Sequence, residues 1–165
     1  MNILAALLIA SSIFGPAFTT QPKVNSKDLQ RLTGTQWQGT LTYLDYRSNK
    51  KVSIPSHLTV IRSVEDKFSW VFEYQYPDEP KANSKDTVTI SRDGRVIDGE
   101  SVIERSSLGG DTTRIVTEKK GMDNDKSALF HYTYLIGASS LSIKKEVRYD
   151  GATEFIERNQ FNWKR

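Results

Sequence analysis

The side chains that most often perform chemistry are scarce in this sequence. Its 165 residues include no cysteine and two histidines, His57 and His131. The lack of cysteine excludes a disulfide framework, a thiolate nucleophile, cysteine-bound zinc and an iron–sulfur cluster, and two histidines exclude a multi-histidine metal centre. The sequence also lacks the Gly-x-Ser-x-Gly motif of a nucleophilic serine. We therefore predict no metal site and identify no catalytic residue.

Three polar residues near the C-terminus could hold the head group of a ligand: Lys145, Glu157 and Asn159. They belong to two segments, 141–149 and 155–163, in which many odd-numbered residues are apolar, as in strands with one buried face. If both odd faces point inward, the three polar side chains lie inside, with Lys145 and Glu157 on a diagonal within reach of each other. They then either hold a ligand in an apolar cavity, or lie near an open mouth and are solvated or neutralise one another.

The turn between these segments decides whether their odd faces coincide. A two-residue loop at Asp150-Gly151 would place Ile143 on the same face as Arg158. A three-residue loop over 149–151, with the glycine in the left-handed conformation, keeps odd with odd. Because a slip of one residue exchanges the two faces, burial favours the three-residue loop. Val147 and Phe155 then share the inner face.

Alternation with a period of two continues through most of the sequence after Gly34. Aromatic residues occupy one face of the segment from Phe68 to Tyr76, and turn sequences such as Asp93-Gly94 and Asp98-Gly99 separate the alternating segments. The spacing predicts about eight to ten strands in a single all-β domain. Long strands joined by short turns favour a single antiparallel up-and-down β-barrel, which also removes exposed strand edges.

The segment Asn25–Gly34 is the helical candidate, with Asn25 as the N-cap, Asp28 at the third position and Gly34 as the stop. Charged residues fill one whole face of the segment 141–149, which argues against an outer-membrane barrel. The net charge of +3 is spread evenly along the sequence, so no nucleic-acid partner is predicted.

The first 22 residues contain no charged side chain, and Ile3–Ala10 is apolar throughout. This apolar stretch has the length found in signal peptides and is too short for a membrane span. We expect a signal peptide over residues 1–19, cleaved after Ala17 or Thr19, followed by a barrel domain over residues 23–165. Export without cysteine favours a periplasmic or secreted protein of bacterial origin.

A short helix, then Gly34-Thr35-Gln36-Trp37 at the first strand, then an aromatic-rich meander and a basic last strand resemble the lipocalins of the calycin superfamily. In that family a tryptophan near the start of the first strand plugs the closed end of an eight-stranded barrel, and an arginine or lysine of the last strand packs across it. Trp37 matches the tryptophan. Arg158 is the nearest candidate for the basic residue, with Lys164 or Arg165 as substitutes.

The resemblance implies a cavity for a small apolar or amphiphilic molecule. Its candidate wall residues are Tyr43, Phe68, Trp70, Phe72, Tyr74 and Phe161. The other interpretation of these aromatic stripes is an ordinary filled core. A related group, the nitrobindins, holds haem through a single histidine, and His131 could match it. The alternation of Phe130 and Tyr132 turns His131 toward solvent, so we expect no haem and no other cofactor.

Three functions remain open at this point. We favour an exported lipocalin-like barrel that binds a small apolar or amphiphilic ligand in its interior. The alternative is a barrel with a filled core that acts as a secreted interaction or inhibitor module, with the loop Tyr76–Lys85 as its contact site. The third is an enzyme whose site lies in the barrel mouth around Lys145, Glu157 and Asn159.

Overall fold

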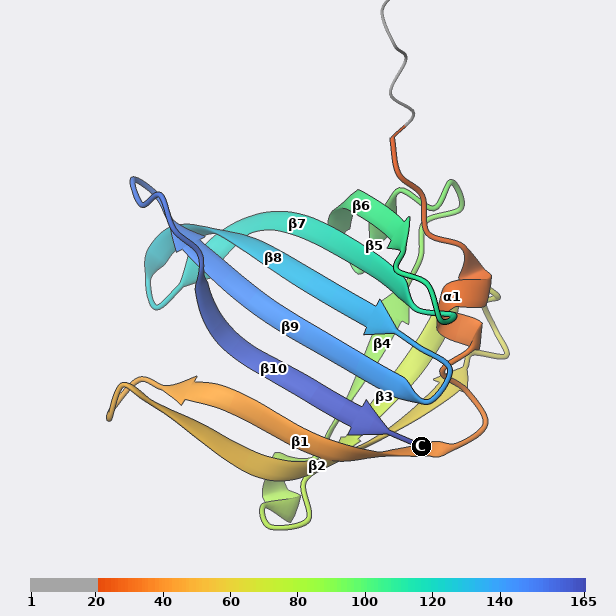
Figure 1. The fold of residues 1–165 in the computed structure, drawn as a ribbon, viewed down its shortest axis with the longest axis horizontal. Coiled ribbons are helices and arrows are strands. Elements are labelled where there is room, and N and C mark those ends of the chain that lie inside the picture. The colour runs from red at the N-terminus through yellow and green to blue at the C-terminus, as the bar shows by residue number, and fades with distance from the viewer. Residues whose placement is uncertain (1–20) are drawn as a thin grey trace, which may run out of the picture.

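The computed structural model describes residues 21–165, which form an all-β domain. Ten antiparallel strands make a nearly closed barrel, and one short α-helix precedes them (Figure 1). The elements are α1 (Ser26–Gln30), β1 (Gln36–Asp45), β2 (Lys50–Arg62), β3 (Ser69–Gln75), the 3₁₀ turn η1 (Pro80–Ala82), β4 (Ser84–Thr89), β5 (Val96–Ile97), β6 (Glu100–Ser107), β7 (Thr113–Asp123), β8 (Lys126–Ile136), β9 (Ser140–Tyr149) and β10 (Ile156–Lys164). This architecture confirms the predicted up-and-down barrel. The expected signal peptide, residues 1–19, lies outside the described residues.

The strands follow one another around the barrel almost in chain order. Each pairs with a neighbour in sequence, and β1 pairs with β10, so the sheet order is β4-β3-β2-β1-β10-β9-β8-β7-β6-β5. The two edges of the sheet are therefore β4 and β5, in the middle of the chain. A single bridge between Ile90 and Ile97 joins them. We call this junction the seam.

The helix α1 begins at the predicted cap. Asn25 and Asp28 form a capping box. The Asn25 side chain accepts a hydrogen bond from a backbone N–H of the first turn, and the Asp28 carboxylate accepts one from the backbone N–H of Asn25. Asp28 also accepts two hydrogen bonds of 2.9 Å from the guanidinium of Arg105 on β6, which fasten the helix to the barrel wall. The helix ends at Gln30, four residues before the expected stop at Gly34. Within the part of the chain that the structure describes, no helix has the length and apolar content needed to cross a membrane.

The end of the barrel beside α1 is closed by Trp37. Its side chain is fully buried, and the indole N–H donates a hydrogen bond of 2.8 Å to the carbonyl of Leu32. The guanidinium of Arg165 lies over the indole, 4.6 Å from the ring centroid. The basic residue that packs across the tryptophan is therefore Arg165. The assignment of this role to Arg158 was wrong, because Arg158 lies near the opposite end of β10.

The pairing of β9 with β10 has the predicted odd-with-odd register near the closed end of the barrel but not near the turn that joins the two strands. Near the closed end Ile143 pairs with Phe161, odd with odd. A β-bulge between Glu157 and Asn159 then adds one residue to β10 and shifts the register by one. Beyond the bulge the residues of β10 that were expected inside face outward.

The bulge overturns two predictions. Phe155 lies on the outer face, where its ring stacks on His131 with 4.2 Å between centroids, whereas Val147 is fully buried inside. Glu157 also faces outward and pairs with Lys51 of β2 at 2.7 Å. Both errors have the same cause, because one extra residue reverses the alternation on which the prediction depended.

Candidate functional site

A cavity of about 560 Å³ lies inside the barrel, beside the seam. Its walls come from β3, β8, β9 and β10, and its rim includes the exposed residues Asp86 and Thr87 of β4 and Asp98 in the turn before β6. Across the seam the amide of Asp98 donates to the carbonyl of Thr89 at 2.8 Å. Among the described residues, no backbone hydrogen bond crosses the seam from Ser84–Val88. The cavity therefore opens sideways, between β4 and the turn before β6.

Aromatic side chains form much of the cavity wall. Tyr74 packs between Phe72 and Phe161, with centroid distances of 6.4 and 5.5 Å. Tyr132 and Tyr134 enter the cavity from β8. Burial raises the pKa of Tyr132 to about 12, so its hydroxyl stays neutral at physiological pH. These rings can pack against the apolar part of a ligand, while their hydroxyls offer polar contacts.

Glu100, at the start of β6, is the most buried carboxyl group of the cavity. It is 6% exposed and accepts a hydrogen bond from the hydroxyl of Thr117. Burial raises the pKa of Glu100 to about 7; the bond from Thr117 and the charges of Lys119 and Lys145 oppose this increase, and Asp98 adds to it. The carboxyl group therefore gains or loses its proton near neutral pH, and the charge of a bound ligand can shift it between the protonated and the ionised form.

Lys145 and Asn159 pair across β9 and β10, and both line the cavity. The ammonium of Lys145 lies 4.5 Å from the ring centroid of Phe130 and 5.8 Å from that of Tyr132, as in cation–π contacts. Within residues 21–165, Lys145 forms no ion pair with a carboxylate. The ammonium of Lys145 is therefore stabilised by the faces of aromatic rings at the edge of the cavity and not by a carboxylate.

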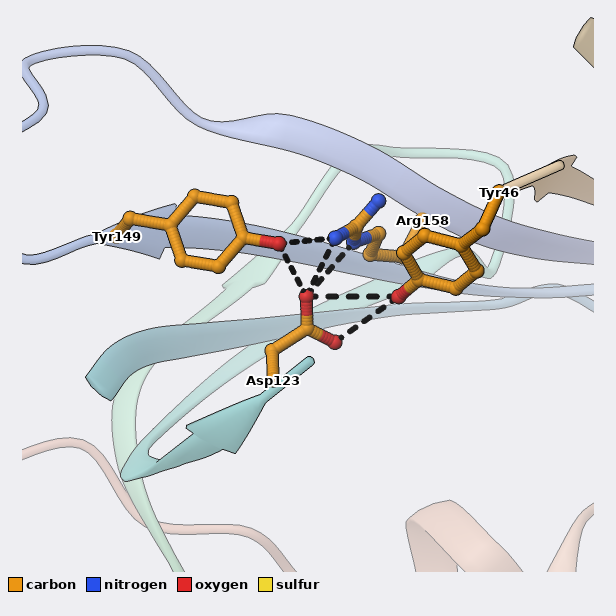
Figure 2. A network of polar contacts seen from close by, with 4 residues as sticks. All are labelled: Tyr46, Asp123, Tyr149 and Arg158. Atoms are coloured by element: carbon orange, nitrogen blue, oxygen red, sulfur yellow. Dashed lines mark hydrogen bonds and ion pairs between the residues drawn. The ribbon is translucent and has the colours of Figure 1, made fainter. Parts of the chain in front are cut away.

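Four residues form a polar network that we call the clamp: Tyr46, Asp123, Tyr149 and Arg158 (Figure 2). Asp123 and Arg158 are buried, Tyr149 is partly buried and Tyr46 is exposed. Asp123 accepts hydrogen bonds from the Tyr149 hydroxyl at 2.7 Å, from Arg158 Nε at 3.1 Å and from the Tyr46 hydroxyl at 3.2 Å. Burial by itself raises the pKa of Asp123, but the bonds from Tyr149 and Arg158 outweigh it and hold this pKa below its ordinary value.

The clamp fixes the directions of the side chains around the β-bulge of β10. Arg158 is the bulge residue, and its side chain is held by the end of β7 and the end of β9. Its neighbour Asn159 lines the cavity. A fixed bulge thus directs Arg158 to the clamp, Asn159 to the cavity and Glu157 to the outer surface.

The structure brings five of the predicted ligand-binding residues to the cavity. These are Phe72, Tyr74, Lys145, Asn159 and Phe161. The other aromatic candidates lie elsewhere: Trp70 is fully buried in the core, Phe68 lies beside Val24 near the closed end, and Tyr43 is half-buried outside the cavity lining. Tyr43 and Trp70 pair with the cavity-lining residues Asn159 and Val88, but neither they nor Phe68 line the cavity themselves.

The enzyme hypothesis required Lys145, Glu157 and Asn159 to act together. Because Glu157 faces outward and pairs with Lys51, this set is not assembled. The sequence analysis assigned no site role to Glu100 or Asp98. The Asp98-Gly99 turn was identified only as a turn, and no periodic signal shows that it borders a cavity.

His131 lies on the outer face of β8, as the alternation predicted. Its Nε2 is 2.8 Å from the carboxylate of Glu118, and its ring stacks on Phe155. Its side chain therefore does not point into the barrel. No group of three or more histidine, aspartate or glutamate residues is arranged to hold a metal ion anywhere in residues 21–165.

Comparison with known proteins bears on the fold alone. No family model matches the sequence, and no curated protein matches it either. Among solved structures, the crystal structure of Rv2717c from M. tuberculosis is similar, with a TM-score of 0.56 and 13% sequence identity. The match covers 87% of this chain and 99% of that one. At this identity the similarity extends to the barrel architecture and no further.

Proposed function

We propose that the protein binds a small amphiphilic molecule in the interior of its barrel. The observation that carries this proposal is the cavity of about 560 Å³ beside the seam. Ligand sites typically have volumes of about 300–1,000 Å³, with mostly apolar walls and a few convergent polar groups. The volume lies within that range, the aromatic rings supply apolar surface, and the buried Glu100 supplies a polar group. The alternative function, a secreted interaction or inhibitor module, assumed a barrel whose core is filled, and such a core would leave no cavity beside the seam.

We also propose that the chain is a lipocalin-like member of the calycin superfamily and that it is exported. The buried Trp37 beneath the guanidinium of Arg165 supports the first part, because it reproduces the closure implied by the resemblance. The ten strands are more than the eight of a lipocalin. Export depends on residues 1–19, and comparing the N-terminus of the protein before and after secretion tests it.

Binding can be tested with the neutral dye Nile red, whose fluorescence rises in apolar surroundings. We expect saturable binding by the purified barrel domain and a bound small molecule in native mass spectrometry of freshly isolated protein. Val88→Trp should abolish binding, because Val88 lines the cavity at the seam and the larger ring would fill it. The matched control is Val64→Trp, at a residue that is 99% exposed. Equal binding by both folded variants would refute the cavity as the site.

A further inference from the structure

The cavity contains more negative than positive ionisable groups. Asp86, Asp98 and Glu100 line it, against one cation, Lys145. The ammonium of Lys119 lies beside Gly99, just outside the cavity, and Lys119 is exposed to solvent. Within the described chain, none of the three carboxyl groups forms an ion pair.

Two deeply buried polar groups of the cavity have capacity for a ligand. Glu100 accepts one hydrogen bond, from Thr117 to its Oε2, and its Oε1 has no partner among the described residues. Tyr134 is 8% exposed and lines the cavity, and its hydroxyl makes no hydrogen bond with any residue in the described range. Buried polar groups are normally hydrogen-bonded. Neither oxygen atom is completely enclosed by protein, so both face the open cavity and can be reached by a polar group of a ligand.

An ammonium group fits these surroundings better than a carboxylate. Its N–H groups can donate to Glu100 and to the oxygen of Tyr134, and its charge is attracted both by carboxylates and by the faces of the aromatic wall. A carboxylate would have to pair with Lys145, whose ammonium already lies on the ring of Phe130, and it would face Glu100 and Asp98. Burial makes an unmatched charge costly in either case.

We propose that the barrel cavity selects ligands whose polar end is a protonated amine, over acids of the same shape. This inference rests on the proposed function and specifies its ligand class. In the complex the amine lies against Glu100 and Tyr134, and the apolar part of the ligand packs against the rings of Phe72, Tyr74 and Phe161.

The test compares three indole compounds that differ in the end group: tryptamine, indole-3-propionate and uncharged 3-ethylindole. Isothermal titration at about pH 8 should give at least about tenfold tighter binding of tryptamine than of the acid, since a charge-assisted hydrogen bond in a buried site contributes about this factor. Glu100→Gln should weaken tryptamine by about tenfold and leave 3-ethylindole unchanged. Glu146→Gln, which removes the same charge from the outer face of β9, should change neither.

Replacing Lys145 should change the affinities for amines and for acids in opposite directions. Lys145→Met should tighten tryptamine, because it removes a like charge from the cavity, whereas it should weaken any acid that used this ammonium. The control is Lys51→Met, which alters the net charge equally on the outer surface. Folding of each variant is checked by circular dichroism, and Asp98→Asn provides a second acidic variant if Glu100→Gln does not fold.

Binding of the amine should also weaken as the pH falls below about 7. Glu100 then takes up its proton, and the groups that face it, namely Thr117, Asp98, Lys119 and Lys145, do not replace the lost charge. Failure of Nile red and all three indoles to bind would overturn the proposed function itself. Binding of Nile red and 3-ethylindole without preference for the amine would overturn only the present inference, as would weaker tryptamine binding by Lys145→Met.

Discussion

The clamp provides the sharpest test of how this barrel is held together. Replacing Asp123 by asparagine keeps the size of the side chain and one acceptor oxygen but removes the negative charge. Arg158 then keeps its charge in a site where its side chain is 9% exposed, without the carboxylate that compensates it. The substitution therefore isolates the ionic contribution of the clamp from its packing.

The magnitude follows from the contacts that remain. Removing one partner of a buried ion pair costs about 3–5 kcal/mol. The guanidinium of Arg158 keeps its place 4.3 Å from the centroid of the Tyr46 ring, and such a contact retains about 1 kcal/mol. We therefore expect Asp123→Asn to lower the free energy of unfolding by about 3 kcal/mol. For a domain of this size the melting temperature should fall by roughly 10 °C.

The assay is urea unfolding of the barrel domain followed by circular dichroism at about pH 7, with melting as a second measurement. The control is Glu157→Gln, which breaks the partly exposed pair with Lys51 one residue away from Arg158 and should cost less than about 1 kcal/mol. In the double variant Asp123→Asn/Arg158→Met much of the loss should be recovered, because no buried charge remains. Equal costs for Asp123→Asn and Glu157→Gln would refute the reasoning.

The same effect has a defined pH dependence. The pKa of Asp123 is lower in the folded state than in the unfolded chain. Its contribution is therefore fully present above the unfolded value of about 3.9 and is lost as the pH falls through the lowered folded pKa. The difference in stability between the wild type and Asp123→Asn should shrink below about pH 3 and be unchanged between about pH 5 and pH 8.

Three further predictions concern other parts of the barrel. The pKa of Glu100 is raised to about 7 in the folded state, so its stabilising contribution is present below about pH 4.5 and lost as the pH rises through 7; Glu100→Gln should gain about 3 kcal/mol relative to the wild type between about pH 4 and pH 8 in urea titrations. Arg165→Ala removes the cation over Trp37 and should cost about 1–2 kcal/mol, with an increase in indole exposure measured by acrylamide quenching. Gly39→Ala would place a Cβ 1.8 Å from the carbonyl oxygen of Asn162; since the backbone cannot yield there, we expect a loss of about 3 kcal/mol or more, and a melting temperature equal to the wild type would contradict the close approach of β1 and β10.

The sequence by itself determined the fold class and most of the inward faces. Alternation of apolar and polar residues specifies which side of a strand is buried, because a strand has only two faces. This is why Phe72, Tyr74 and Phe161 were placed correctly in the interior. The N-cap at Asn25 was likewise readable, because capping is a local interaction between a side chain and the first turn.

Tertiary structure decided where in the interior each residue lies and where the alternation breaks. The bulge at Arg158 has no signal in the alternating pattern, since it is fixed by Asp123, which is 35 residues away in sequence. It moved Phe155 and Glu157 to the outer face. The seam and the exposed turn at Asp98 depend on how far β6 extends along β7, which no single strand encodes.

The buried Glu100 shows the same limit in the candidate site. In the sequence it is one glutamate in a charged segment, and only its place inside the folded barrel, bonded to Thr117, removes it from solvent. Local patterns thus specify which face of a strand is apolar, whereas burial of a polar group, the position of a cavity and the pairing of distant charges are properties of the closed barrel. They arise from contacts between residues far apart in sequence, and periodicity carries no information about these contacts.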